Sequence, residues 1–278
     1  MDREPRTVAV ASLNTAALPG HLPPIAQRAA EICRFLESSD HDVINLQEVW
    51  GRRYLDLFRR ALPSYPFVDW RAGIAGQPCG GLATFSRLPI GQVHYTAFRA
   101  SRPNAGGALF RLGMRARSAL HGALTVALPS ARAVVGNAHL VANLDGDWSA
   151  DNRHHRIQRD QITILHQALT RARAATGAEL AILSGDLNVA STSPLYPLIT
   201  DNGAWRDPFA ATDPPTFHVE YLPPGATGQR IDYLLVAGDE QRHRVLECGL
   251  ILGEPVELPD GRSHLSDHFG LHGTITLG

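Results

Sequence analysis

The chain has 278 residues, 44% of them hydrophobic and 19% charged, which excludes intrinsic disorder over most of its length and permits a large core. Its 26 basic and 27 acidic residues give a net charge of -1, which argues against nucleic-acid binding through bulk positive charge but leaves a local basic groove open. Every basic residue is an arginine, so chemistry that requires a lysine, such as a Schiff base, is excluded.

Short apolar segments rich in β-branched residues predict strands along the whole chain. In chain order they are Thr7–Leu13, Val43–Leu46, Gly81–Ser86, Ile90–Thr96, Ala123–Leu128, Ala133–Leu140, Leu180–Ser184, Ile231–Val236, Leu246–Leu252 and Leu271–Leu277.

Helical spacing of apolar residues predicts helices between these strands. The first follows Pro23-Pro24 and carries apolar residues from Ile25 to Leu36. A shorter helix is expected around Tyr54–Leu62, and a longer one begins near Ser149 and carries Ile157 to Leu169. Strands with interspersed helices and no clear linker favour α/β or α+β layers around one core, and hence one domain over residues 1–278.

Segments rich in glycine, proline and polar residues predict three surface loops, which we expect to carry substrate specificity: Ala100–Ala108, Leu144–Asn152 and Asp213–Gly228. No run approaches the ~20 apolar residues that span a bilayer, so no transmembrane segment is predicted. The three cysteines are odd in number and far apart, which argues against a disulfide framework. The charged first residues do not resemble a secretory signal peptide, and we expect the protein to be cytoplasmic.

Polar side chains recur at the ends of the predicted strands, which suggests that they converge on one pocket. They are Asn14, Glu48, His139, Asp186 with Asn188, Asp232, and Asp267 with His268. Carboxylate and amide oxygens are hard ligands that suit Mg²⁺ or Mn²⁺ better than zinc. Hydrolysis of a phosphoester by an activated water needs such a set: a metal, a base and donors for the developing charge.

Six motifs follow one another along the chain: Asn14, Gln47-Glu48-Val49, His139-Leu140, Gly185-Asp186-Leu187-Asn188, Arg230-Ile231-Asp232-Tyr233 and Ser266-Asp267-His268. In this order they resemble the endonuclease/exonuclease/phosphatase superfamily. Within it the sequence most resembles the neutral sphingomyelinase branch, on Asn14-Thr15, Leu46-Gln47-Glu48-Val49-Trp50, Thr84-Phe85-Ser86-Arg87-Leu88-Pro89-Ile90 and His155-Arg156. The resemblance spans nearly the whole chain. It implies a four-layer α/β (α+β) sandwich, in which two facing, mostly antiparallel sheets are flanked by helices.

The resemblance also implies a role for each matching residue. Glu48 is the expected principal metal ligand, with Asn14 beside it, and Asp267 reaches the metal or its waters. Asp186 and Asn188 orient the attacking water or the phosphoryl oxygens. His268 is the expected general base or charge stabiliser, Asp232 fixes its tautomer, and His139 donates to the phosphoryl group or the leaving oxygen.

The sequence departs from the sphingomyelinase pattern at one catalytic position. Members of that branch usually carry a lysine near the middle of the chain, whereas here Arg115 and Arg117 are the residues available to bind phosphate. Trp50 is expected to line the pocket. No leader and no exposed aromatic hairpin for membrane contact is visible, so a soluble phosphoester is at least as good a candidate substrate as a phospholipid.

The sequence leaves other interpretations open. Asn14 and the Gly185–Asn188 segment taken alone would suit ordinary turns, Asp232 would suit an ion pair with Arg230, and His268 would suit a buried core histidine. At the level of function, we expect an Mg²⁺-dependent phosphodiesterase, with Mn²⁺ as an alternative metal. The rivals are a nuclease on the same fold, an enzyme recruited to a biosynthetic pathway, and a non-catalytic binding protein.

Overall fold

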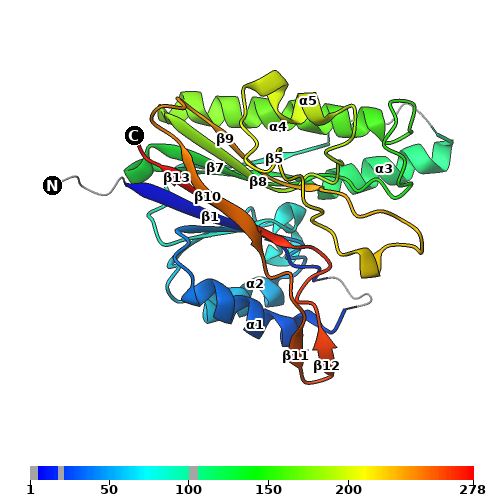
Figure 1. Ribbon diagram of the computed structural model, residues 1–278, viewed down its shortest axis with the longest axis horizontal. Helices are drawn as coiled ribbons and strands as arrows, with labels where there is room; N and C mark the ends of the chain where they lie inside the picture. The colour runs from blue at the N-terminus through cyan, green and yellow to red at the C-terminus, as the bar shows by residue number, and fades with distance from the viewer. Residues whose placement is uncertain (1–5, 18–21, 100–105) are drawn as a thin grey trace.

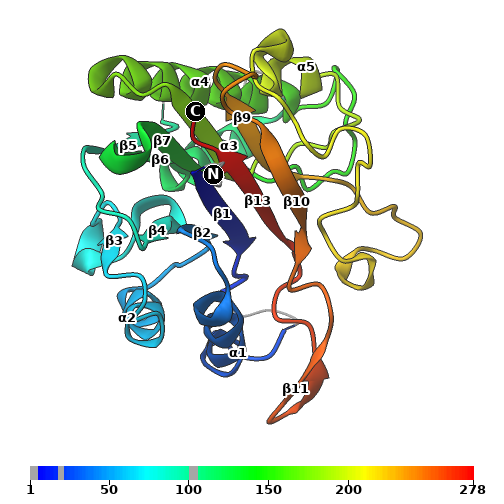
Figure 2. The same ribbon diagram turned by 60° about the vertical axis from the view of Figure 1, so that its left-hand side comes forward.

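The computed structural model describes residues 6–17, 22–99 and 106–278, so most of the Ala100–Ala108 loop predicted above lies outside the described residues. Figures 1 and 2 show two sheets stacked face to face between layers of helix. The helices are α1 (Ile25–Ser38), α2 (Arg52–Ala61), α3 (Ala108–Leu120), α4 (His155–Thr176) and α5 (Tyr196–Ile199).

The six-stranded sheet has the order β10-β13-β1-β2-β4-β3, and only its β1–β2 pair is parallel. The five-stranded sheet has the order β5-β6-β7-β8-β9, and only its β7–β8 pair is parallel. A separate hairpin pairs β11 with β12. The strands are β1 (Thr7–Asn14), β2 (Val43–Gln47), β3 (Phe67–Asp69), β4 (Ala83–Ser86), β5 (Val93–Ala97), β6 (Gly122–Leu128), β7 (Ala133–His139), β8 (Leu180–Asp186), β9 (Asp232–Ala237), β10 (Val245–Ile251), β11 (Val256–Leu258), β12 (Gly261–Ser263) and β13 (Gly270–Thr276).

Side-chain alternation along the strands builds three apolar layers. On β1, Val8 and Val10 face the five-stranded sheet, whereas Ala11 and Leu13 face α1 and α2 on the outside. The outer face of the five-stranded sheet packs on α4 through residues such as Leu165. The predicted four-layer sandwich is therefore confirmed.

Buried polar side chains tie the two sheets together below one edge of the sandwich. The Nδ2 of Asn45 donates to Ser184 Oγ at 2.9 Å, and the Nε2 of Gln47 donates to Asn137 Oδ1 at 2.8 Å. The amide of Asn137 in turn donates to the Leu46 carbonyl at 3.0 Å. Because buried amides are stable only when their hydrogen bonds are made, these contacts fix how one sheet sits on the other.

The helices differ from the sequence-based expectations in where one begins and in one that was not expected. The long helix α4 begins at His155 rather than near Ser149, because residues 149–154 form turns in which the Asn152 side chain accepts from the His154 N–H at 2.7 Å. Helix α3 was not predicted, because its leucines point largely to solvent and leave no wide apolar face for the pattern to reveal.

Gly185 is required by the close approach of β7 and β8. Its φ is +144°, and a Cβ built there would lie 2.1 Å from the Ala138 carbonyl oxygen. We expect Gly185→Ala to lower the free energy of unfolding by at least about 3 kcal/mol, measured by urea denaturation. Gly177→Ala is the matched control: φ is +64° but nothing lies within 4 Å of the added Cβ, so a loss of about 1 kcal/mol is expected. Equal losses in the two variants would contradict the steric argument.

Candidate active site

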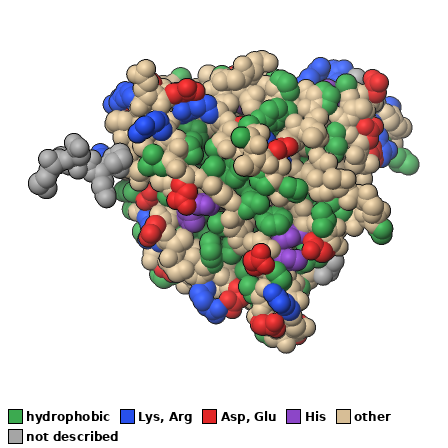
Figure 3. Space-filling model, in the orientation of Figure 1, with side chains coloured by type: hydrophobic (Ala, Val, Ile, Leu, Met, Phe, Trp, Pro, Cys, Tyr) green, Lys and Arg blue, Asp and Glu red, His purple; other side chains and the backbone are tan. Residues whose placement is uncertain are grey.

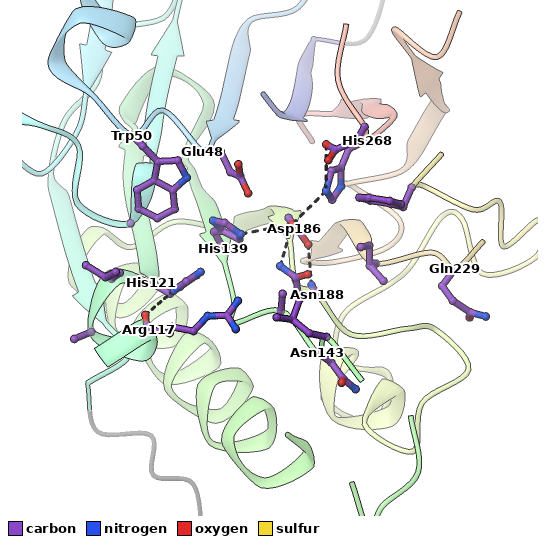
Figure 4. Close-up of a pocket in the computed structure, with 18 of the residues that line it drawn as sticks. Glu48, Trp50, Arg117, His121, His139, Asn143, Asp186, Asn188, Gln229 and His268 are labelled. Carbon is purple, nitrogen blue, oxygen red and sulfur yellow. Dashed lines mark hydrogen bonds and ion pairs between the residues drawn. The ribbon is translucent and has the colours of Figure 1, made fainter. Parts of the chain in front are cut away.

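A large cavity opens at the edge of the sandwich where β2, β7 and β8 end, and its volume is about 1380 Å³. Figure 4 shows polar side chains entering it from both sheets. Residues from the predicted set that line this cavity are Glu48, Trp50, Arg117, His139, Asp186, Asn188, Asp267 and His268. Asn14 and Asp232 lie directly behind them and hydrogen-bond to them. Only Arg115 lies apart, exposed on α3 and not part of the lining.

Asp186 lies at the centre of the polar cluster, buried to 1% exposure at the end of β8. Its Oδ2 accepts from the amides of Asn14 and Asn188, each at 3.0 Å, and its Oδ1 accepts from the Asn188 backbone N–H at 2.8 Å. Burial, and then the nearby carboxylate of Asp232, raise the pKa of Asp186 to about 8. A carboxyl group with a pKa near neutrality is suited to accept and release a proton.

His268 is held between two carboxylates. Its Nδ1 donates to Asp232 Oδ2 at 2.9 Å, and its Nε2 lies 3.8 Å from Asp186 Oδ2. Burial acts to lower the pKa of His268, but the carboxylates of Asp232 and Asp186 outweigh it and raise the pKa to about 10. Asp232 is therefore the hydrogen-bond partner of His268 and not the ion-pair partner of Arg230, whose guanidinium pairs with Asp207 at 2.8 Å. The ring is poised to carry a positive charge in the site.

Glu48 brings a further, half-buried carboxylate to the same edge, directly after β2. Its backbone is left-handed, with a φ of +58°, which is rare for a residue with a side chain and is typical of functional sites. Burial raises the pKa of its carboxyl group. The Asn14 Nδ2 lies 3.4 Å from Glu48 Oε1, while the Asn14 Oδ1 accepts from the Ala16 N–H at 3.0 Å. Asn14 thus presents its amide N–H to the acids rather than its oxygen.

The carboxylates of this edge fit a divalent cation. The half-buried Glu48 and Asp267 line one cavity with the buried Asp186, and acids crowded together away from water are costly unless a positive charge joins them. Asp186, Asp232 and His268 also offer ligand atoms that all lie within 4.8 Å of one another. The oxygen-rich set matches Mg²⁺ or Mn²⁺, with Glu48 and Asp267 as the residues that would hold the ion.

A wall of rings closes the other side of the cavity. His139, at the end of β7, points its Nε2 toward Asp186 Oδ2 at 3.6 Å. Its ring centroid lies 4.7 Å from that of His121 and 6.0 Å from that of Trp50. The His121 Nδ1 donates to the Arg117 carbonyl at 2.7 Å, so its Nε2 is free of the proton. Burial lowers the pKa of both histidines, which keeps these rings neutral.

Sequence reasoning missed several lining residues, among them His121, Asn143, Phe217 and Gln229. His121 follows the stretch that carries Arg117 and directly precedes an apolar strand. A polar residue at the end of a strand was the pattern used for the other site residues, so it could have indicated His121 as well. Asn143 lies just before the predicted Leu144–Asn152 loop, and both this loop and Asp213–Gly228 supply lining residues. Their part in specificity stays a prediction.

Comparison with known proteins identifies the relationship. A family model described as Endonuclease/Exonuclease/phosphatase family matches residues 11–268. The chain belongs to the endonuclease/exonuclease/phosphatase family. The resemblance predicted from the motifs is confirmed, and the chain is by class a phosphoester hydrolase. No curated protein sequence matches the chain significantly.

Several solved structures share the fold. They include an endonuclease/exonuclease/phosphatase from Bacteroides vulgatus (19% identity, TM-score 0.70, covering 98% of this chain and 100% of that one). Sphingomyelinase C from Streptomyces griseocarneus has 20% identity and a TM-score of 0.66, covering 97% of this chain and 99% of that one. D. rerio TDP2 complexed with single strand DNA product has 16% identity and a TM-score of 0.69, covering 97% and 99%.

In this member of the family, a buried arginine joins the two loops that carry the site. Arg28 on α1 is 1% exposed, and burial lowers its pKa to about 10, so it stays charged at neutral pH. Its guanidinium donates to the carbonyls of Thr15 at 2.9 Å and Ala16 at 2.6 Å, and also to that of Leu265. These carbonyls flank Asn14 on one side and the Ser266–His268 motif on the other.

We therefore expect Arg28→Met to lower the free energy of unfolding by at least about 3 kcal/mol, because several buried carbonyls lose their donor. Arg28→Lys keeps the positive charge but lacks the planar guanidinium that donates to several carbonyls at once. This variant should still fold, but it should bind Mg²⁺ more weakly than the wild type. Urea denaturation and metal titration measure the two effects. Arg34→Met, on the exposed face of the same helix, should change stability by no more than about 0.5 kcal/mol. Wild-type metal affinity in Arg28→Lys would contradict the positioning role.

Proposed function

We propose that this protein is a metal-dependent phosphodiesterase that uses water as its nucleophile. The observation that supports it is the convergence of Glu48, Asp186, Asp267 and His268, from two different sheets, on the floor of one cavity. The residues from either sheet, taken alone, would be an ordinary group of polar side chains. Together they supply the base, the cation site and the charge stabiliser that phosphoester hydrolysis requires.

The pKa directions distribute the roles. Asp186, with its pKa near neutrality, accepts the proton of the attacking water, and Asn14 and Asn188 hold its carboxylate in place. His268 carries the positive charge and directs its Nε2–H toward the charge that develops on the phosphoryl oxygens. A divalent cation held by Glu48 and Asp267 would supply further positive charge there and favour the ionised form of nearby carboxyl groups.

The shape of the cavity favours a diester over a monoester. In Figure 4, Trp50 and Gln229 lie on opposite sides of Asp186. The lining also includes Gln77, Tyr95 and Phe217. A phosphoryl group at the centre therefore has room for a substituent in both directions. His139, beside Asp186, is placed to donate to one of the ester oxygens.

Nucleic acid is the less favoured substrate. Among the described lining residues, the only arginines are Arg99 and Arg117. On the face shown in Figure 3, the arginine side chains lie toward the periphery and the middle is largely apolar, so no basic track crosses this face. A polynucleotide needs such a track along its phosphates.

A phosphoester panel tests the proposal. Purified protein is assayed with Mg²⁺, Mn²⁺ or a chelator on bis(4-nitrophenyl) phosphate, 4-nitrophenyl phosphate, phosphatidylcholine in mixed micelles, and single-stranded DNA. We expect metal-dependent cleavage of a diester, and its loss in Asp186→Asn. Cleavage of the monoester alone would replace the diester assignment, and preferential cleavage of DNA would establish the nuclease. Absence of hydrolysis on every substrate would favour a non-catalytic binding protein.

A further inference from the structure

The mouth of the cavity carries exposed aliphatic side chains. Ile74, Leu120 and Leu144 belong to its lining and yet are 86%, 58% and 72% exposed. On the same helix as Leu120, Leu109 is 87% exposed and Leu112 is 66% exposed. Single exposed leucines are common, but a group of them around one opening is typical of an interaction surface. We call these five side chains the mouth patch.

Helix α3 presents its part of the mouth patch as a stripe. At about 100° per residue, Leu109, Leu112 and Leu120 fall within an arc of about 80°. On the other side of the helix, Met114 and Ser118 are buried against the protein. The stripe therefore faces away from the core, and the fold provides nothing among the described residues that covers it.

The charges on α3 are all of one sign. The helix carries Arg111, Arg115 and Arg117 and no acidic residue, and Arg111 and Arg115 are exposed. None of these arginines has an ion pair within the part of the chain that the structure describes. Asp145, one of the acids of the lining, is already paired with Arg153. An occupant that matches this surface is therefore apolar and negatively charged together.

We propose that the mouth patch binds the surface of an anionic lipid bilayer. Leucines on a helix that lies flat on a membrane enter the boundary of the acyl region, while arginines beside them reach the lipid phosphates. A second copy of the chain fits less well, because like arginines would meet and α3 has no acid to pair with them. Nucleic acid would satisfy the arginines but leave the leucines in water.

Because Leu120, Ile74 and Leu144 are part of both the patch and the cavity lining, docking there turns the cavity opening toward the lipid surface. The inference depends on the exposed side chains and charges of the mouth, and it is tested by binding alone. Its outcome is therefore independent of whether the proposed phosphodiesterase activity is found.

The experiment is co-sedimentation of the full chain with vesicles, in chelator so that no hydrolysis occurs. Vesicles of phosphatidylcholine alone are compared with vesicles that also contain phosphatidylglycerol, at low and high salt. We expect binding to the anionic vesicles only, reduced at least about thirtyfold in Leu109→Ser/Leu112→Ser, since each leucine contributes about tenfold or somewhat less. Arg111→Gln/Arg115→Gln should weaken binding about tenfold and flatten its salt dependence.

Leu246→Ser is the matched control, because Leu246 is 50% exposed but lies on β10 of the six-stranded sheet, outside the mouth patch. Binding of this variant to the anionic vesicles should stay within about twofold of wild type. Thermal melts verify that the exposed substitutions leave the fold intact. The proposal is overturned if the wild type stays in the supernatant, or if the leucine pair binds as tightly as the wild type. A dimer in solution that the leucine pair dissociates would equally overturn it, in favour of a self-association surface.

Discussion

Replacing Glu48 with Gln is expected to reduce phosphodiester turnover by about three orders of magnitude while the protein stays folded. Several kcal/mol of transition-state stabilisation depend on the cation that this carboxylate is proposed to hold. In the absence of metal, the same variant should melt at or above the wild-type temperature. The carboxyl group is partly buried and burial raises its pKa, so removing its charge relieves a cost of folding.

The second half of this result separates a metal ligand from a merely structural residue. Mg²⁺ should raise the melting temperature of the wild type and leave that of Glu48→Gln unchanged, because only an ion that binds the folded state stabilises it. Glu257→Gln, on the exposed β11 strand, is the control and should behave as wild type in both assays. A wild-type rise in melting temperature with Mg²⁺ in Glu48→Gln would show that residues other than Glu48 hold the metal.

Replacing His268 with Ala is expected to lower turnover by about a thousandfold, because the imidazolium that is proposed to face the phosphoryl oxygens is lost. Asp232→Asn should cost less, about a hundredfold, since the ring remains but loses the carboxylate that orients and charges it. The double variant should be no worse than His268→Ala, because both act through one ring.

Steady-state kinetics on the diester found in the panel measure these losses, and circular dichroism verifies the fold. His94→Ala, exposed on β5, is the control for loss of a histidine and should retain activity. Near-normal turnover in His268→Ala would refute the role assigned to this ring. Additive losses in the double variant would show that Asp232 acts by a separate route.

Most of the strands and most of the site followed from the sequence because the signals are local, whereas the short strands β3, β11 and β12 were not predicted. Runs such as Leu180–Leu183 are apolar on both faces, since both faces of a central strand are buried in a four-layer fold. A carboxylate directly after such a run, as at Glu48 and Asp186, has only the rim of the sheet to occupy. The family motifs then supplied the pairing of distant segments, which periodicity does not contain.

The features that escaped prediction depend on contacts between distant segments. Arg28 reads as one more polar residue on α1, and only the assembled fold shows that its guanidinium meets the Thr15 and Leu265 carbonyls. The ring of His121 contacts the ring of His139, and no sequence pattern indicates that these two residues meet. Arg115 and Arg117 were equivalent in sequence, and the turn of α3 sends only Arg117 into the cavity.

The site is divided between the sheets: Asn14, Glu48 and His268 come from the six-stranded sheet, and His139, Asp186 and Asp232 from the other. Its hydrogen bonds from Asn14 to Asp186 and from His268 to Asp232 therefore span the seam. Catalytic activity is therefore expected to depend on the contact between the two sheets. In mild denaturant, activity should be lost before the helical circular dichroism signal, because these hydrogen bonds break as soon as the two sheets separate.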